Sequence, residues 1–182
     1  MQIMTMMRGL PMAAALLLAA CQGQNAQPTA GSSANPAEVR FTTNAYQIIE
    51  FDRQEGALAQ TEARDPEVKA LAQQLTSQAN EFANRLAPSA AEASITPPRV
   101  LREDLRVRLS HMRLQQGLDF DRNYVADQIA SHEEVLRMEN GMNNEGVTPQ
   151  YVALMQQGNA LLQTNLDKLR AIQTRIGPPK RI

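Results

Sequence analysis

Residues 65–86 read DPEVKALAQQLTSQANEFANRL and set the class of structure that the chain can form. Asp65 can cap a helix, Pro66 suits the first helical position, and Glu67 faces the positive end of the helix dipole. The stretch therefore predicts an amphipathic helix. Its inner face is wholly apolar and consists of residues at spacings of three and four: Val68, Leu71, Ala72, Leu75, Ala79, Phe82 and Leu86.

The stretch before it predicts another helix, with two acids in its inner face. Positions at spacings of three and four fall on one stripe of a helix at 100° per residue. A buried carboxylate without a partner costs several kcal/mol, so the two acids in this stripe are candidate functional residues. The stripe contains Phe41, Ala45, Ile48, Asp52, Glu55 and Ala59.

A loop is expected between Pro88 and Pro98, and the third helix that follows it is expected to break near Gly117. Asp119 can cap the second part of that helix. The inner face of the second part contains a histidine among mostly apolar neighbours. Its residues are Val125, Gln128, Ile129, His132, Val135 and Leu136.

The last helix opens at Thr148-Pro149, which repeats the cap-plus-proline start, and ends before Gly177. Only 4% of the residues are aromatic, there is no Trp, and no useful stretch alternates as a strand would. Helices of this length joined by modest loops pack as an antiparallel bundle. We therefore predict an all-α fold, an antiparallel four-helix bundle over residues 37–177, followed by a tail at 178–182.

The N-terminus predicts export. An apolar run of eleven residues ends at Ala20, too short to span a bilayer, which takes about 20 apolar residues, and typical of a signal peptide over residues 1–20. The four residues Leu18-Ala19-Ala20-Cys21 resemble the bacterial lipobox. The chain has one cysteine, and it stands where lipidation requires it. An ordinary signal peptide that happens to end in cysteine is the alternative.

The lipobox resemblance implies that Cys21 carries acyl chains and holds the protein on a membrane. Gln22 follows the cysteine, whereas Asp at that position retains enterobacterial lipoproteins in the inner membrane. The resemblance therefore implies the outer membrane, facing the periplasm. Residues 21–36 are rich in Gln, Asn, Ala, Ser and Gly and are expected to form a flexible tether.

Charge and motifs argue against two function classes. The 18 basic and 19 acidic residues give a formal charge of −1, whereas a nucleic-acid binder normally has a basic excess. No phosphate loop, HExxH or GxSxG motif occurs. His111 and His132 have no cysteine near them, which excludes a zinc site of the Cys/His type. We expect neither nucleic-acid binding nor catalysis.

The motif Gly117-x-x-Phe120-Asp121-x-x-Tyr124, with His132 eight residues later, resembles a family of exported bacterial proteins. The family is described as predicted outer membrane proteins with a ferritin-like domain of unknown function, and the resemblance covers residues 38–175. It implies a ferritin-like bundle with an acid on the first helix, Asp-His on the second and a histidine on the fourth.

The chain departs from this family pattern at two positions. Ala79, after Gln78, stands at the second-helix histidine, and Asn165 stands at the fourth-helix histidine. Two-metal sites in ferritin-like bundles need about six inward ligands, commonly including Glu-x-x-His pairs, which this chain lacks. Asp52, Glu55 and His132 are therefore interpreted as a polar cluster that fixes helix register, with no cofactor, or alternatively as the remnant of a site for one divalent metal ion.

A basic stripe is expected on the third segment. Arg99, Arg102, Arg106 and Arg113 fall within about 60° of one another at 100° per residue, and Arg108 lies off the stripe. The stripe is either a solvated face, partly paired with the neighbouring acids Glu103 and Asp104, or a contact with an anionic surface or partner.

These observations lead to two hypotheses. The first is a lipid-anchored, non-enzymatic helical module that binds a partner or supports the envelope. The second is a ferritin-like metal-binding or redox protein that uses Asp52, Glu55 and His132.

Overall fold

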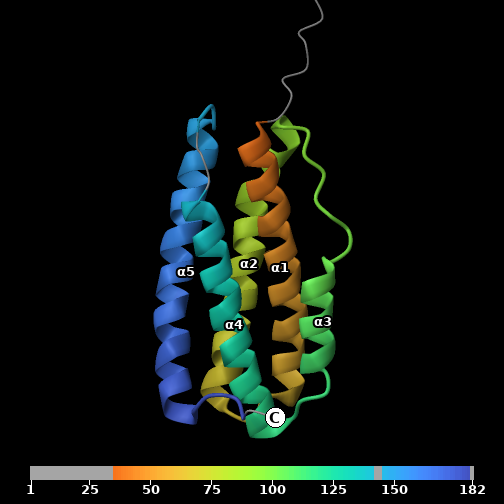
Figure 1. The fold of residues 1–182 in the computed structure, drawn as a ribbon, viewed down its shortest axis with the longest axis vertical. Helices are drawn as coiled ribbons and strands as arrows, with labels where there is room; N and C mark the ends of the chain where they lie inside the picture. Colours follow the sequence, from red (N-terminus) through yellow and green to blue (C-terminus); the bar gives the residue numbers. More distant parts are fainter. Residues whose placement is uncertain (1–34, 142–144, 181–182) are drawn as a thin grey trace, which may run out of the picture. The chain divides into compact units, whose positions relative to one another are not determined.

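The computed structural model describes residues 35–141 and 145–180 and is all-helical, as predicted. The expectations for residues 1–20 and for 21–34, Cys21 included, lie outside these residues. The described part contains five helices and no strand (Figure 1). They are α1 (Pro36–Glu62), α2 (Pro66–Glu92), α3 (Glu103–Met112), α4 (Gly117–Asn140) and α5 (Pro149–Ile176).

Capping residues and prolines start three of the helices. Asn35, Asp65 and Thr148 are the N-cap residues of α1, α2 and α5, and each is followed by a proline in the first turn. The Asp65 carboxylate accepts hydrogen bonds from the N–H groups of Glu67 at 2.9 Å and Val68 at 3.2 Å. The start predicted for the second helix is therefore confirmed.

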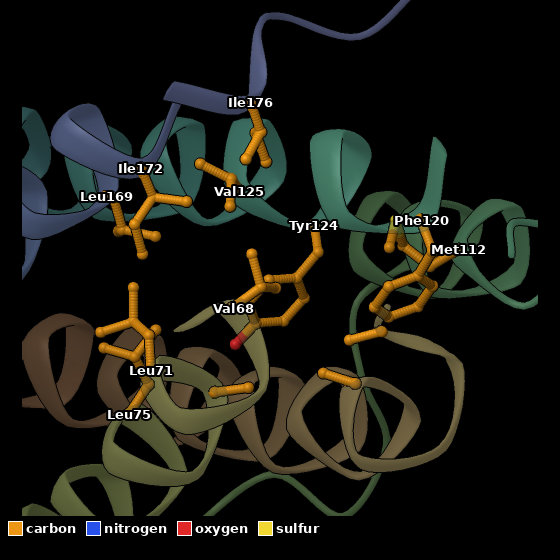
Figure 2. Packing of buried hydrophobic residues seen from close by; sticks show 13 residues of the cluster. Val68, Leu71, Leu75, Met112, Phe120, Tyr124, Val125, Leu169, Ile172 and Ile176 are labelled. Atoms are coloured by element: carbon orange, nitrogen blue, oxygen red, sulfur yellow. The ribbon is translucent and has the colours of Figure 1, made fainter. Parts of the chain in front are cut away.

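The four long helices lie side by side, and α3 lies outside them against α1 (Figure 1). α1 packs along α2 and α4, and α5 packs along α4 and α2. At one end of this bundle, Figure 2 shows Tyr124 pointing from α4 into the interior beside Val68 of α2. Apolar side chains of α2, α4 and α5 surround it, among them Leu71, Leu75, Val125, Leu169 and Ile172.

The most specific motif of the sequence, residues 117–124, fastens α4 to the turn between α1 and α2. The buried Asp121 carboxylate accepts hydrogen bonds from the backbone N–H groups of Arg64 at 3.0 Å and Asp65 at 2.9 Å. Phe120 and Tyr124 stack with ring centroids 5.9 Å apart. We call Asp121 and its two backbone donors the turn clasp. The motif therefore has a structural role.

The C-terminal end of α5 closes on the same turn. Arg175 binds Asp65 through two guanidinium nitrogens, at 2.6 and 2.9 Å. This guanidinium is the main cause that lowers the pKa of Asp65. In the same region, Arg122 of α4 donates to the carbonyl oxygen of Ile176 at 2.8 Å. Three helices thus meet at the residue that starts α2.

The start predicted for the loop between Pro88 and Pro98 is wrong, because α2 continues through Pro88 to Glu92; residues 93–98 lie outside the helices, as predicted. Proline removes the hydrogen bond to the carbonyl four residues earlier, at Asn84. Both residues are exposed, so water can bind that carbonyl instead. The next turn buries Ser89 and Ala90, which gives the helix a packing reason to continue.

The third segment breaks before Gly117, in agreement with the expectation. α3 ends at Met112, and α4 begins at Gly117, whose φ of +57° lies in the left-handed region that favours glycine. The expected cap at Asp119 is wrong, because the N-cap is Gln116 and Asp119 lies in the first turn. None of the helices in residues 35–141 and 145–180 is long and apolar enough to cross a membrane.

Replacing Asp121 by Ala tests the turn clasp. It leaves two partly buried backbone N–H groups without an acceptor, so we expect the free energy of unfolding to fall by about 2–4 kcal/mol in chemical denaturation. Asp121→Asn keeps one carbonyl oxygen and should lose less. Asp167→Ala, which removes an exposed carboxylate from α5, is the control and should change little. Equal stability of the Asp121→Ala chain and its parent would contradict the clasp.

Candidate functional site

The two acids predicted on the inner face of the first helix do point inward. Asp52 and Glu55 lie one turn apart on α1 and are both buried. A buried carboxylate needs donors in place of water, so its neighbours determine whether it can react or bind.

Gln128 of α4 supplies those donors. Its side-chain Nε2 donates to Asp52 Oδ1 at 3.2 Å and to Glu55 Oε2 at 2.8 Å. One amide therefore bridges both acids and ties α1 to α4. Its N–H hydrogens point at the carboxylate oxygens, which are the atoms that a cation would use.

Arg108 and Asp127, for which the sequence predicted no role in this site, complete the polar cluster. Arg108 of α3 donates to Asp127 Oδ1 at 2.6 Å and to the Asp127 backbone oxygen at 2.9 Å, and it lies over the Phe51 ring at 4.7 Å. Arg108 lies off the predicted basic stripe. This position could have predicted its role, because a residue off the solvent-facing side of α3 faces the bundle.

Burial shifts two acids of the cluster, Asp52 and Glu55, toward their protonated forms. Burial raises the pKa of Asp52 to about 7, against the lowering effects of the Gln128 amide and the Arg108 charge. Burial also raises the pKa of Glu55 well above its ordinary value, and a hydrogen bond with the Asp127 carboxyl adds to the rise. A proton on Glu55 lets this carboxyl donate to Asp127.

His132 points inward, as predicted, but it forms no hydrogen bond with the acids. Burial lowers the pKa of His132 to about 4, with a smaller opposing effect of the Gln128 backbone. The ring is therefore neutral at pH 7, and its Nδ1 has no hydrogen-bond partner among the described residues.

The two positions that differ from the family pattern lie in the same part of the interior. Asn165 of α5 donates from Nδ2 to Gln78 Oε1 of α2 at 2.9 Å, so an amide pair joins these helices. Asn165 Oδ1 is buried without a partner in the described part of the chain. Ala79 adds only a methyl group.

A cavity of about 70 Å³ lies among these residues. Its wall is mostly apolar, with polar groups from four helices: Asp52, Gln78, His132, Glu139 and Asn165. One water needs roughly 10–15 Å³ by the same measure, so the cavity has room for a few waters or a hydrated ion. Glu55 does not line it.

These residues do not fit the two-metal centre of ferritin-like proteins. Within residues 35–141 and 145–180, no group of three or more His, Cys, Asp or Glu side chains could hold a metal ion. The amide of Gln128 occupies the carboxylate oxygens, and Ala79 and Asn165 stand at the positions where the family resemblance implied histidines.

The arginines do not form the predicted helical stripe. Of the four arginines assigned to the stripe, only Arg106 lies inside α3; Arg99 precedes the helix, and Arg102 and Arg113 are its two cap residues. Arg102 pairs with Asp104 at 2.9 Å and also with Glu134 of α4, and Arg106 pairs with Glu103. The pairing with Glu103 and Asp104 considered for this segment therefore occurs.

Comparison with known proteins places the chain in a family without an assigned function. A family model described as "Domain of unknown function (DUF4142)" matches residues 22–172. The fold is similar to the crystal structure of a DUF305 fragment from Deinococcus radiodurans, with a TM-score of 0.69 and 15% identity over 78% of this chain and 98% of that one. That likeness concerns the fold alone. No curated protein matches the chain.

The raised pKa of Asp52 predicts a pH dependence that Asp52→Asn removes. A folded pKa of about 7, above the ordinary 3.8, means that the stability associated with this group falls as pH rises from about 4 to about 7. Above pH 7, Asp52→Asn should be more stable than the parent by a few kcal/mol, since one pKa unit corresponds to about 1.4 kcal/mol.

Chemical denaturation of both proteins between pH 5 and 8 measures this difference. His132 and the other titrating groups are present in both chains, so their contributions largely cancel. Asp167→Asn, an exposed site on α5, is the control and should follow the parent at every pH. Parallel stability curves for Asp52→Asn and the parent would show that Asp52 is charged in the folded protein throughout this range.

Proposed function

Since the chain belongs to the DUF4142 family of domains of unknown function, we propose from its own residues that it is a non-enzymatic helical module of the bacterial envelope. In this proposal Cys21 carries the lipid, the protein is held at the outer membrane on its periplasmic side, and the bundle binds a partner or supports the envelope. We also infer that α1, α2, α4 and α5 act as an antiparallel, ferritin-like four-helix bundle, with α3 as the first part of a broken third helix.

The observation that supports a non-catalytic role is the bridge made by Gln128. Catalytic acids must reach a substrate or a metal ion, but Asp52 and Glu55 share one amide donor inside the protein. A polar group that can bond only in one helix register selects that register, as buried polar residues do in coiled coils. In this proposal the cluster holds the helices in one register, and a partner binds to the outer surface of the bundle.

Lipid attachment is supported by the residues around the cysteine. The segment Leu18-Ala19-Ala20-Cys21 contains the chain's one cysteine, fifteen residues before the first helix begins at Pro36. Acyl chains contribute about 0.8 kcal/mol per buried methylene, so more than one chain gives stable anchoring.

Mass spectrometry of the protein expressed in a bacterium tests the anchor. We expect the N-terminal peptide to begin at Cys21, with the added mass of the acyl groups, and the protein to fractionate with membranes. Cys21→Ser should abolish both properties. An unmodified Cys21 in a freely secreted chain would contradict the proposed anchoring.

A second candidate function is the binding of one divalent metal ion. The cavity favours it, because Asp52 and His132 both line the cavity and because His132 Nδ1 and Asn165 Oδ1 are buried polar atoms without hydrogen-bond partners in the described chain. Imidazole, carboxylate and amide oxygen are ligands for such ions. Glu55 would support the site from the next turn of α1.

Metal analysis of the purified protein decides between the two functions. If the bundle is non-metallic, zinc, copper, manganese or iron should neither copurify in stoichiometric amount nor raise the thermal midpoint. Stoichiometric metal that is lost in His132→Ala and kept in His111→Ala would support the metal function. His111 is the matched control because it is exposed on α3.

A further inference from the structure

The outer side of α3 and its flanks carry the most exposed apolar side chains of the described structure. The exposed fractions are 68% for Val100, 59% for Val107 and 79% for Leu114. The three residues are seven apart, and each directly follows an arginine, at positions 99, 106 and 113. We call these six residues the basic-apolar face.

The geometry of α3 keeps this face toward solvent. Leu105, Leu109 and Met112 are the buried residues of α3, and they hold its inner side on the bundle. Val107 lies on α3, and Leu114 lies in the turn directly after the C-cap residue Arg113; the side chains of both residues are exposed. Figure 1 shows α3 outside the long helices, next to α1.

The entry to α3 is fixed to the bundle by one side chain of α1. The Gln47 amide donates to the carbonyl oxygen of Val100 at 2.9 Å and accepts from the N–H of Arg102 at 2.7 Å. The backbone around Val100 is therefore held in place, and its exposed side chain belongs to a fixed surface.

The three arginines of this face can bind an anionic partner, because acids of the other described helices do not hold them as they hold Arg102 and Arg108. Arg102 and Arg108 are held by acids of α4. Arg99 and Arg113 have no ion pair within residues 35–141 and 145–180, and Arg106 pairs only with the exposed Glu103. Residues 99–114 contain five arginines and two acids, a formal charge of +3 in a chain whose total is −1.

We propose that the basic-apolar face binds the surface of a bilayer that contains anionic phospholipids. This inference rests on the proposed envelope function and names the partner. Aliphatic side chains insert shallowly into a bilayer interface, and neighbouring arginines bind headgroup phosphates while their methylene stems cover apolar surface.

The composition of the face favours a bilayer over an acidic protein as the partner. The energetic centre of a protein interface is usually rich in aromatic residues. This face has none, and its three aliphatic side chains are spread singly along the segment, each beside a cation. A fluid bilayer surface can accommodate aliphatic side chains at this spacing, because it needs no complementary pocket for each of them.

The tether is long enough for this contact. The fifteen residues from Cys21 to Asn35 reach up to about 50 Å when extended. α1 has 27 residues and is about 40 Å long, so a segment beside its second half remains within reach of a lipid on Cys21.

Vesicle sedimentation tests the inference with residues 21–182 carrying Cys21→Ser, which keep every described helix and cannot be acylated. We expect binding to vesicles of phosphatidylglycerol and phosphatidylcholine that weakens at high salt, and little binding to pure phosphatidylcholine. Arg106→Gln/Arg113→Gln should bind about 30-fold more weakly, at about fivefold for each arginine near an anionic surface. Val107→Ser/Leu114→Ser should also weaken binding.

The control is Arg40→Gln/Arg137→Gln, which makes the same charge change at exposed residues of α1 and α4 and should bind like the parent. Circular dichroism confirms that each variant is folded. Equal losses in the control and the α3 variants would overturn the inference, because they would show an effect of net charge alone. Absence of binding to anionic vesicles would also overturn it and favour an acidic protein partner, while acylated Cys21 in the mass spectrum would leave the anchored role intact.

Discussion

The turn clasp is the interaction on which the arrangement of the helices depends. Asp121 satisfies two N–H groups at the turn between α1 and α2, and so it sets where α4 begins relative to both helices. Gln128 follows two turns later on α4 and reaches the two acids of α1 only if that start is correct. The clasp and the polar cluster are thus two fixed points on one pair of helices.

The polar cluster illustrates how a helical bundle can accommodate acids in its interior. A charged carboxylate in the interior needs several strong donors, and the cluster offers one amide and one arginine for three acids, Asp52, Glu55 and Asp127. Protonation balances that shortage, because a neutral carboxyl needs fewer donors and can itself donate. The raised pKa values of Asp52 and Glu55 are consistent with this shortage of donors, because they favour the protonated carboxyls.

Much of the fold could be predicted because helix starts and helix faces depend on local spacing. The helix start at Asp65-Pro66 needed only capping chemistry, and the inward positions Asp52, Glu55 and His132 needed only periodicity. The predictions that failed, and the contacts that were missed, depend on tertiary packing, which short-range sequence spacing does not contain. Pro88 remains helical because the next turn is buried, and the pair between Arg108 and Asp127 joins residues 19 apart on two helices.

The candidate site was less predictable than the fold for the same reason. Helical spacing showed that Asp52 and Gln128 face inward, but not that one amide would reach two acids across the bundle. The cavity beside His132 exists because small side chains such as Ala79 leave space between the helices. A helical wheel shows which residues face inward but not the space that they leave. The basic stripe failed because the wheel assumed a helix where Arg99 lies in a connecting segment.

The contact between Arg175 and Asp65 has a consequence for biosynthesis. A ribosome makes the chain from its N-terminus, and Asp65 lies 110 residues before Arg175, so Asp65 emerges long before the arginine that pairs with it. This contact cannot form before α5 has been synthesised. The pairing of α5 with the start of α2 is therefore a late event in co-translational folding, because it follows the synthesis of every other described helix.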